Sequence, residues 1–250
     1  MFYPLKGGKK VEILVLGSAD MNSRCFSSSF LIDGRILVDI PGGACRELLK
    51  RGIGPTSVDA VLITHLHGDH VLDLPIWALQ KTKAPQPEEG GIRIAVNENG
   101  RLWLETLVRN SFSTSLTEEK TGHYFRWITQ DEFTLGALRV RRIPVEHGNL
   151  PDCFGYLVTD GSVTVGFTGD SRLCCGVRAL AEAADLLFCD CDLIAGNDKH
   201  MGIDDLLSLS KEYPGTRIVA THVKDKTRKE LLRVKPEGIT AAADGESFRI

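Results

Sequence analysis

A cluster of histidines at the end of an apolar segment is the feature that most limits how this chain can fold. The segment VDAVLITH contains the unbroken apolar run AVLI, which predicts a strand buried on both faces. Residues 63–71 read ITHLHGDHV, so three of the chain's seven histidines fall here: His65, His67 and His70, with Asp69 between the last two. Imidazoles and a carboxylate at this density are typical metal ligands, so the segment predicts a metal centre at the end of a strand.

The spacing of these residues would let one short segment serve two metal ions. His65 and His67 are two positions apart, so their side chains point to the same side of an extended chain. Gly68 then permits a tight turn, which can redirect the chain before Asp69 and His70.

Three more candidate ligands follow apolar strands elsewhere in the sequence. His147 follows LRVRRIPVE, Asp170 follows SVTVGFTG, and His222 follows TRIVAT. A side chain at the end of a strand can reach a site beyond the edge of its sheet. We therefore expect these three residues to join the histidine cluster.

The order of the predicted elements indicates an α/β fold built from two similar halves. Short strands with an Asp33-Gly34 hairpin signal open the chain, and strands followed by helices occur twice. Helices are expected at 44–52, 71–82, 98–110, 176–184, 203–212 and 225–232. Residues 111–122 are polar and weakly patterned, which predicts a mobile loop. Two sheets packed face to face under helices give a four-layer α/β/β/α sandwich, with residues 1–250 as a single domain.

Five motifs in this sequence together resemble the metallo-β-lactamase superfamily over nearly the whole chain. They are LVDIPGG with Asp39, THLHGDH, VEHG, FTGDS and ATHV, in the order of that family. The resemblance implies the metallo-β-lactamase fold and two divalent metal ions, zinc first, with manganese or iron as the other choices. It implies one ion on His65, His67 and His147, a second on Asp69, His70 and His222, and Asp170 bridging both. Asp69 would also be catalytic, and Asp39 would fix the loop that carries the histidines.

His200 indicates a particular branch of this superfamily. It precedes a helical pattern that lies between Asp170 and His222, and it is similar in position to a histidine of the phosphodiesterase branch. That branch includes RNase Z and small cyclic phosphodiesterases of phosphonate breakdown. The resemblance implies that His200 protonates the leaving oxygen or hydrogen-bonds a phosphoryl oxygen. Lys199 departs from the family, which usually has a small residue there.

The substrate predicted from these features is a small linear or cyclic phosphodiester, cleaved by a hydroxide that bridges the two metals. Arg172, Lys224 and Lys226 follow candidate ligands closely and are candidate phosphate contacts. The segment between His147 and Asp170 is too short for the protruding arm of tRNA-processing enzymes. A net charge of −3 likewise disfavours nucleic acid without excluding it.

Other functions remain open at this point. An acyl hydrolase of lactones or thioesters would use the same ligands, but it would have less need of His200. A single-strand nuclease without the tRNA-binding arm and a non-catalytic binding protein are further alternatives. A homodimer is also open.

The apolar runs and the cysteines of the sequence indicate a cellular compartment. No apolar run is long enough for a membrane span, and the start of the chain lacks a secretory pattern. The seven cysteines have no zinc-finger spacing, and Cys189 and Cys191 share an apolar run. We interpret the cysteines as reduced thiols, which favours a cytoplasmic location.

Overall fold

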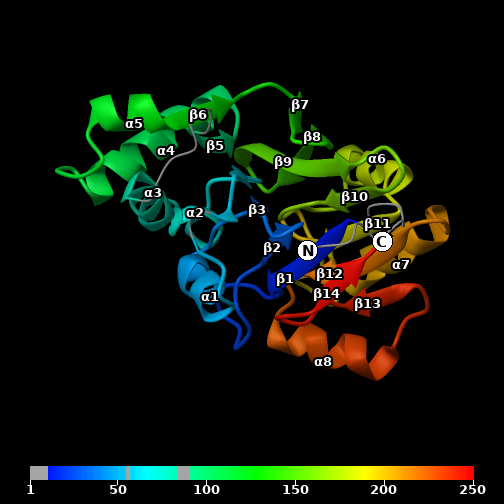
Figure 1. Ribbon diagram of the computed structural model, residues 1–250. Coiled ribbons are helices and arrows are strands. Elements are labelled where there is room, and N and C mark those ends of the chain that lie inside the picture. The colour runs from blue at the N-terminus through cyan, green and yellow to red at the C-terminus, as the bar shows by residue number, and fades with distance from the viewer. Residues whose placement is uncertain (1–10, 55–56, 84–90) are drawn as a thin grey trace, which may run out of the picture.

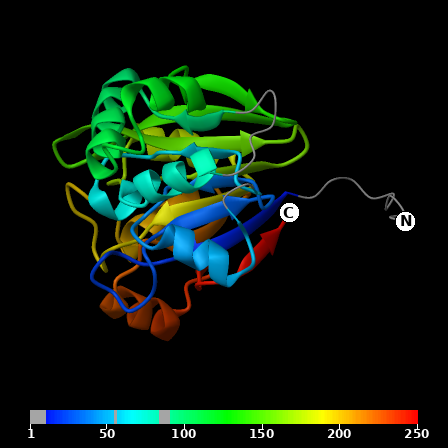
Figure 2. The ribbon, with the colours of Figure 1, turned by 60° about the vertical axis from the view of Figure 1, so that its left-hand side comes forward.

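Two seven-stranded sheets form the centre of the computed structural model, which describes residues 11–54, 57–83 and 91–250. The first sheet has the order β14 (Ser247–Arg249), β1 (Glu12–Gly17), β2 (Ser29–Ile32), β3 (Ile36–Val38), β4 (Ala60–Leu62), β5 (Ile92–Ala95) and β6 (Phe125–Ile128). The second has the order β13 (Ile239–Ala241), β12 (Arg217–Thr221), β11 (Leu186–Asp190), β10 (Thr164–Phe167), β9 (Leu150–Thr159), β8 (Leu138–His147) and β7 (Glu132–Leu135). Figures 1 and 2 both show the C-terminal strand β14 beside β1.

The first sheet joins an antiparallel part to a parallel part. The predicted hairpin connects β2 and β3, and its turn residues Asp33 and Gly34 both have positive φ, 49° and 68°. These left-handed conformations match the twist of the flanking strands. Strands β3 to β6 are then parallel, and β4 is buried throughout, as the apolar segment VDAVLITH predicts.

The helices lie in two groups on opposite sides of the sheets (Figure 1). One group is α1 (Ala44–Lys50), α2 (Gly68–Val71), α3 (Leu74–Lys83), α4 (Glu98–Ser111) and α5 (Glu118–Tyr124). The other group is α6 (Cys175–Ala183), α7 (Ile203–Glu212) and α8 (Asp225–Val234). Among the described residues, none of the helices is long and apolar enough to cross a membrane.

Three apolar clusters hold these layers together. One contains inward-facing residues of both sheets, among them Phe30 of the first and Phe167 and Phe188 of the second. The second cluster joins the first sheet to its helices through residues such as Trp77, and the third joins the second sheet to α6, α7 and α8. A core between the sheets and one on each outer face define four layers, which confirms the predicted α/β/β/α sandwich.

The predicted loop over 111–122 is wrong for its second half. Residues 118–124 form α5, and α4 extends to Ser111. Thr117 caps α5, since its side chain accepts from the amide of Lys120, and Glu118 and Glu119 lie in the first turn near the positive end of the helix dipole. These local capping signals outweigh the weak apolar periodicity.

The strand directions bring the candidate ligands to one end of the sandwich. Strand β8 is antiparallel to β9, and β9 to β10, so β8 and β10 run the same way, as do β11 and β12. The C-terminal ends of β8, β10 and β12 therefore meet at one edge, and they carry His147, Asp170 and His222.

Candidate metal centre

Three imidazoles and a carboxylate converge at this end of the sandwich. Donor atoms of His65, His67, His147 and Asp170 all lie within 4.8 Å of one another. The Nδ1 atom of His67 lies 3.1 Å from Nε2 of His65 and 3.3 Å from Nε2 of His147. A zinc ion at the usual distance of about 2.0–2.1 Å from each nitrogen would place tetrahedral ligands about 3.3 Å apart. Two of the three nitrogen pairs already have that spacing and the third lies within 4.8 Å, so this cluster fits a divalent ion.

A second cluster lies beside the first and shares Asp170 with it. Asp69, His70 and His222 have donor atoms within 4.8 Å of one another. Asp170 presents Oδ1 to His70 Nε2 at 3.4 Å and Oδ2 to His222 Nε2 at 3.3 Å. Its Oδ2 is also 3.7 Å from His65 Nε2 in the first cluster. Asp170 thus lies between the two clusters, where the resemblance to the metallo-β-lactamase superfamily implies a bridging ligand.

The outer nitrogen of several of these histidines is held by a neighbouring group. His65 Nδ1 lies 3.0 Å from Thr64 Oγ1, and His147 Nδ1 donates to the carbonyl of Lys199 at 2.9 Å. His70 Nδ1 donates to Asp39 Oδ2 at 2.8 Å. Each of these contacts leaves Nε2 directed inward, as a metal-binding imidazole requires.

The electrostatics of the site favour a positive charge. Burial lowers the pKa of His65 well below its usual range, so its imidazole is neutral and able to bind a metal. Burial also acts to lower the pKa of His222, but the carboxylates of Asp170, Asp69 and Asp190 together outweigh it and raise that pKa to about 9. Among the described residues, His70 Nε2 and both ring nitrogens of His222 are buried without a hydrogen-bond partner. A cation in the second cluster would satisfy His70 Nε2 and His222 Nε2.

Several residues around the site have left-handed backbone conformations, and these orient the candidate ligands. His222 and Asp39 have left-handed φ values of 54° and 58°, which are uncommon for residues with a side chain. The amide of His222 donates to Ser28 Oγ at 2.8 Å, so a loop of the first sheet holds it in place. Gly169, at φ 61°, passes so close to Thr64 that a Cβ atom there would lie 2.7 Å from its Cβ. This close approach brings Asp170 against the first sheet.

His200 lies next to both clusters, although it follows β11 by ten residues. Its ring centroid is 4.6 Å from that of His147, and it stacks on His222 at 5.3 Å. Its Nδ1 is 2.9 Å from Oδ2 of the fully buried Asp190. Burial acts to lower the pKa of His200, but the hydrogen bond and charge of Asp190 raise it. The sequence analysis missed Asp190, because only the fold of the loop after β11 brings His200 back onto that strand.

The candidate phosphate contacts differ in their surroundings. The guanidinium of Arg172 forms a close ion pair with Glu146, and Lys224 Nζ lies 2.5 Å from Asp192 Oδ2. Lys226 is exposed in the first turn of α8. The charges of Arg172 and Lys224 are therefore already balanced by carboxylates.

Among the described residues, no cysteine belongs to either ligand cluster. All seven are free thiols, and Cys189 and Cys191 are fully buried. Six of the seven histidines, in contrast, belong to the clusters or to the adjoining His200 group, and the seventh, His123, is exposed in α5.

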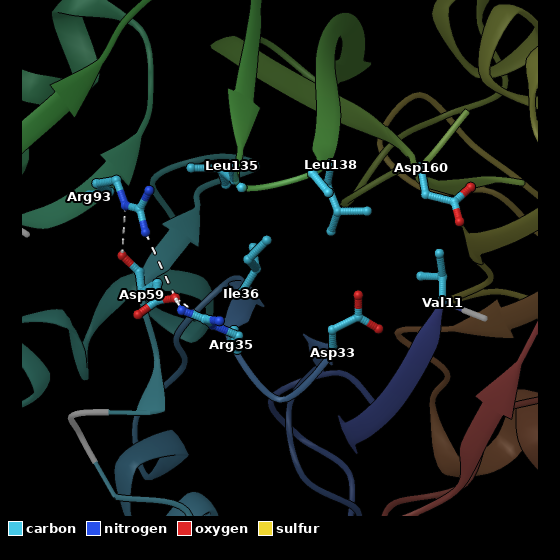
Figure 3. Close-up of a pocket in the computed structure, with 11 residues that line it drawn as sticks. Val11, Asp33, Arg35, Ile36, Asp59, Arg93, Leu135, Leu138 and Asp160 are labelled. Atoms are coloured by element: carbon cyan, nitrogen blue, oxygen red, sulfur yellow. Dashed lines mark hydrogen bonds and ion pairs between the residues drawn. The ribbon is translucent and has the colours of Figure 1, made fainter. Parts of the chain in front are cut away.

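A hollow larger than the space between the ligand clusters lies at the opposite end of the strands from the histidines (Figure 3). Its volume is about 420 Å³, and it lies at the start of β3 and β8 and at the turn between β9 and β10. Its charged groups already serve the fold: Arg35 and Arg93 both contact Asp59, and Asp33 accepts from the amide of Glu12. The chemistry of the molecule therefore belongs to the histidine end.

Comparison with known proteins places this geometry in a family. The model of the family described as "Anti-Pycsar protein Apyc1" matches residues 11–241. The chain belongs to this family. The probable metallo-hydrolase YhfI of Bacillus subtilis is 26% identical over 224 residues, which cover 85% of this chain and 87% of that protein.

Solved structures share the fold along almost the whole chain. The crystal structure of YhfI from Bacillus subtilis has a TM-score of 0.76 at 21% identity and covers 96% of this chain and 99% of that one. A diphosphatase from the PhnP family has a TM-score of 0.75 at 21% identity, covering 96% and 98%. The short form of human tRNase Z has a TM-score of 0.71 at 20% identity, covering 95% and 98%. Fold, ligand cluster and family together identify a metal-dependent hydrolase with the metallo-β-lactamase fold, of the RNase Z-like branch.

Proposed function

We propose that this protein hydrolyses small phosphodiesters at a centre of two divalent metal ions, zinc in the first instance. His65, His67 and His147 would hold one ion, Asp69, His70 and His222 the other, and Asp170 would bridge them. When bound, such a pair of ions polarises a phosphoryl oxygen and acidifies a water molecule for attack on phosphorus.

The single observation that carries the proposal is the placement of His200. A phosphate ester of an alcohol needs a proton on its leaving oxygen, and His200 lies against both ligand clusters with its ring fixed by Asp190. In the imidazolium form, Nδ1–H donates to Asp190, and Nε2–H is free for the oxygen that leaves phosphorus. Asp190 is the positioning residue for this step.

The charges around the centre support a small substrate. Arg172 and Lys224 are paired with Glu146 and Asp192, so they offer no continuous basic surface to a polynucleotide. The relatives point to the same reaction class: a PhnP-family diphosphatase and human tRNase Z share the fold, and both names denote action on phosphate esters or anhydrides. A cytoplasmic location is consistent with seven free thiols.

The first experiment is hydrolysis of bis(p-nitrophenyl) phosphate by protein loaded with Zn²⁺ or Mn²⁺, with chelated protein as the control. We expect metal-dependent turnover that His65→Ala and Asp170→Ala abolish. His123→Ala serves as the matched control, because this histidine is exposed in α5, away from both clusters. Wild-type rates in the Asp170→Ala protein would refute the assigned centre.

His200→Ala separates the phosphodiesterase from an acyl hydrolase. We expect it to lower kcat for a phosphodiester with an alcohol leaving group, such as adenosine 2′,3′-cyclic phosphate, by about 10²–10⁴-fold at unchanged metal content, the usual contribution of a general acid. Bis(p-nitrophenyl) phosphate should be affected much less, because nitrophenolate leaves without a proton. Asp190→Asn should lower kcat less and change its pH profile, since it alters only the hydrogen bond to His200. If metal-loaded protein cleaves lactones or thioesters and leaves phosphodiesters intact, the acyl hydrolase is the correct function.

A further inference from the structure

The outer ring nitrogen of His222, Nδ1, is buried without a hydrogen-bond partner among the described residues. The outer nitrogens of His65, His70 and His147 contact a hydroxyl, a carboxylate and a backbone carbonyl. In the proposed centre, Nε2 of His222 faces Asp170 and the second ion, so Nδ1 carries the proton. A buried N–H group without an acceptor costs free energy, which a suitably placed acceptor would remove.

Two carboxylates at the end of β11 lie on this outer side of the ring. Oδ1 of Asp190 is 3.8 Å from His222 Nδ1, and Oδ1 of Asp192 is 4.0 Å from it. Both oxygens of Asp190 already accept hydrogen bonds, Oδ1 from the amide of Asp192 and Oδ2 from His200 Nδ1. Oδ1 of Asp192 is buried and has no partner in the described part of the chain. An unpaired donor and an unpaired acceptor therefore face each other.

Asp192 is held in place by its other contacts. Its side chain is 2% exposed, and its Oδ2 lies 2.5 Å from Nζ of Lys224. Its amide donates to Asp190, and its carbonyl accepts from Thr227 Oγ1 at 2.8 Å. Thr227 is buried in α8, the helix that follows His222, so this helix fixes the backbone of Asp192. Turning the carboxylate toward another donor would break its ion pair with Lys224.

A separation of 4.0 Å is too long for a direct hydrogen bond, and it matches two polar atoms joined by one water molecule. A water about 2.8 Å from both atoms would accept from His222 Nδ1–H and donate to Asp192 Oδ1. Its other hydrogen can reach Asp190 Oδ1, which gives the three partners usual for buried water. Building on the two-metal centre of the proposed function, we propose that these three groups bind one water molecule. Through it, Asp192 fixes the tautomer and the orientation of His222.

The same network gives Lys224 a role different from the phosphate contact that its place after His222 predicts. Its ammonium balances the buried carboxylate of Asp192 and keeps Oδ1 directed at the imidazole. Lys224 thus acts on the ligand through Asp192 and is a positioning residue.

Metal affinity tests the role of Asp192. Wild type and Asp192→Asn are compared by competition for Zn²⁺ with a chromophoric chelator. We expect Asp192→Asn to lower the affinity for one of the two ions by about 10–100-fold, as loss of a group that orients a ligand does, and to leave the other within about twofold. Glu146→Gln is the matched control, because it removes a carboxylate that is paired with Arg172 next to the ligand His147. Wild-type affinity for both ions in Asp192→Asn, or an equal loss in Glu146→Gln, would overturn the proposal.

Lys224→Met distinguishes a positioning residue from a phosphate contact. We expect it to lower the affinity for the same ion, by less than Asp192→Asn does. The Kd of the Zn²⁺-loaded protein for inorganic phosphate, measured by calorimetry, should stay within about twofold of wild type. A weaker Kd for phosphate at wild-type metal affinity would make Lys224 a phosphate contact and overturn its assigned role.

A spectroscopic measurement keeps this inference separate from the proposed function. Long-range ¹H–¹⁵N spectra of Zn²⁺-loaded protein with ¹⁵N-labelled histidine show which ring nitrogen of His222 carries the proton. We expect an Nδ1–H that exchanges slowly with solvent in wild type and faster in Asp192→Asn. If wild type binds fewer than two ions but shows this difference, the two-metal centre fails and the role of Asp192 stands. If wild type binds two ions and the exchange rates are equal, the role of Asp192 fails and the proposed function stands.

Discussion

Asp39 connects the first sheet to the candidate metal centre through one side chain. It follows β3 and is buried, and its two oxygens accept from the amide and hydroxyl of Thr64 at 2.8 and 2.7 Å. Oδ2 also accepts from His70 Nδ1 at 2.8 Å. Asp39 therefore fixes both the start of the histidine loop and the orientation of one imidazole in it.

Replacing Asp39 with asparagine should weaken metal binding more than it weakens folding. The amide would present a donor or a weaker acceptor to His70 Nδ1–H, and losses of this kind cost about 10–100-fold in metal affinity. Competition with a chromophoric chelator measures the affinity. Asp33→Asn is the control, since Asp33 lies at the far turn of the hairpin, where its side chain accepts from the backbone amide of Glu12. Equal metal affinity in Asp39→Asn and wild type would show that Asp39 has no part in the centre.

At the level of single residues, the sequence predicts the site where several ligand-type side chains fall close together along the chain. It does not predict a contact that depends on the path of a loop. Three histidines and an aspartate in six positions predict ligands without any structure. The partner of His200 could not be predicted, because Asp190 is an ordinary residue at the end of an apolar strand. It becomes part of the site only because the ten residues after it fold back over β11.

Among the elements, α6 packs unusually close to β8, the strand that carries His147. A Cβ atom on Gly176, in the first turn of α6, would lie 1.9 Å from the carbonyl oxygen of Pro144. No side-chain rotation can relieve a clash with backbone, so an alanine there must push the helix away from the strand.

Gly176→Ala should therefore destabilise the protein by about 1–3 kcal/mol, the usual cost of overpacking. Gly122→Ala is the matched control, because Gly122 lies in α5 with no atom within 4 Å of the new Cβ, and alanine favours a helix by up to about 1 kcal/mol. Urea denaturation of both variants gives the two free energies of unfolding. A Gly176→Ala protein as stable as wild type would mean that α6 can move outward freely.

Element prediction succeeds where periodicity is strong and fails where capping decides. Residues 98–110 have a clear helical pattern, and α4 covers them. Residues 118–124 lack such a pattern, and a threonine cap with two glutamates in the first turn is enough to start α5. A search for caps in weakly patterned segments would have found it.

For the molecule as a whole, the candidate ligands join the two sheets across their shared core. His65, His67, Asp69 and His70 follow β4 of the first sheet, whereas His147, Asp170 and His222 follow strands of the second. The alternation of strands and helices predicts this arrangement, since strand ends of both halves must meet where the sheets pack. The contact between His147 and the loop that carries Lys199 could not be predicted, because it depends on where two irregular segments meet.

Metal ions bound across the sheets should stabilise the whole fold. A ligand present at about 1,000 times its Kd adds about 4 kcal/mol to the free energy of unfolding, which for a chain of this size corresponds to roughly 10 °C in Tm. We expect a chelator to lower Tm by about that amount, and added Zn²⁺ or Mn²⁺ to restore it. In Asp170→Ala, the loss of the shared carboxylate should reduce the difference between loaded and chelated protein, whereas His123→Ala should retain it. Identical melting curves with and without chelator in wild type would mean that the six clustered histidines hold no ion that links the sheets.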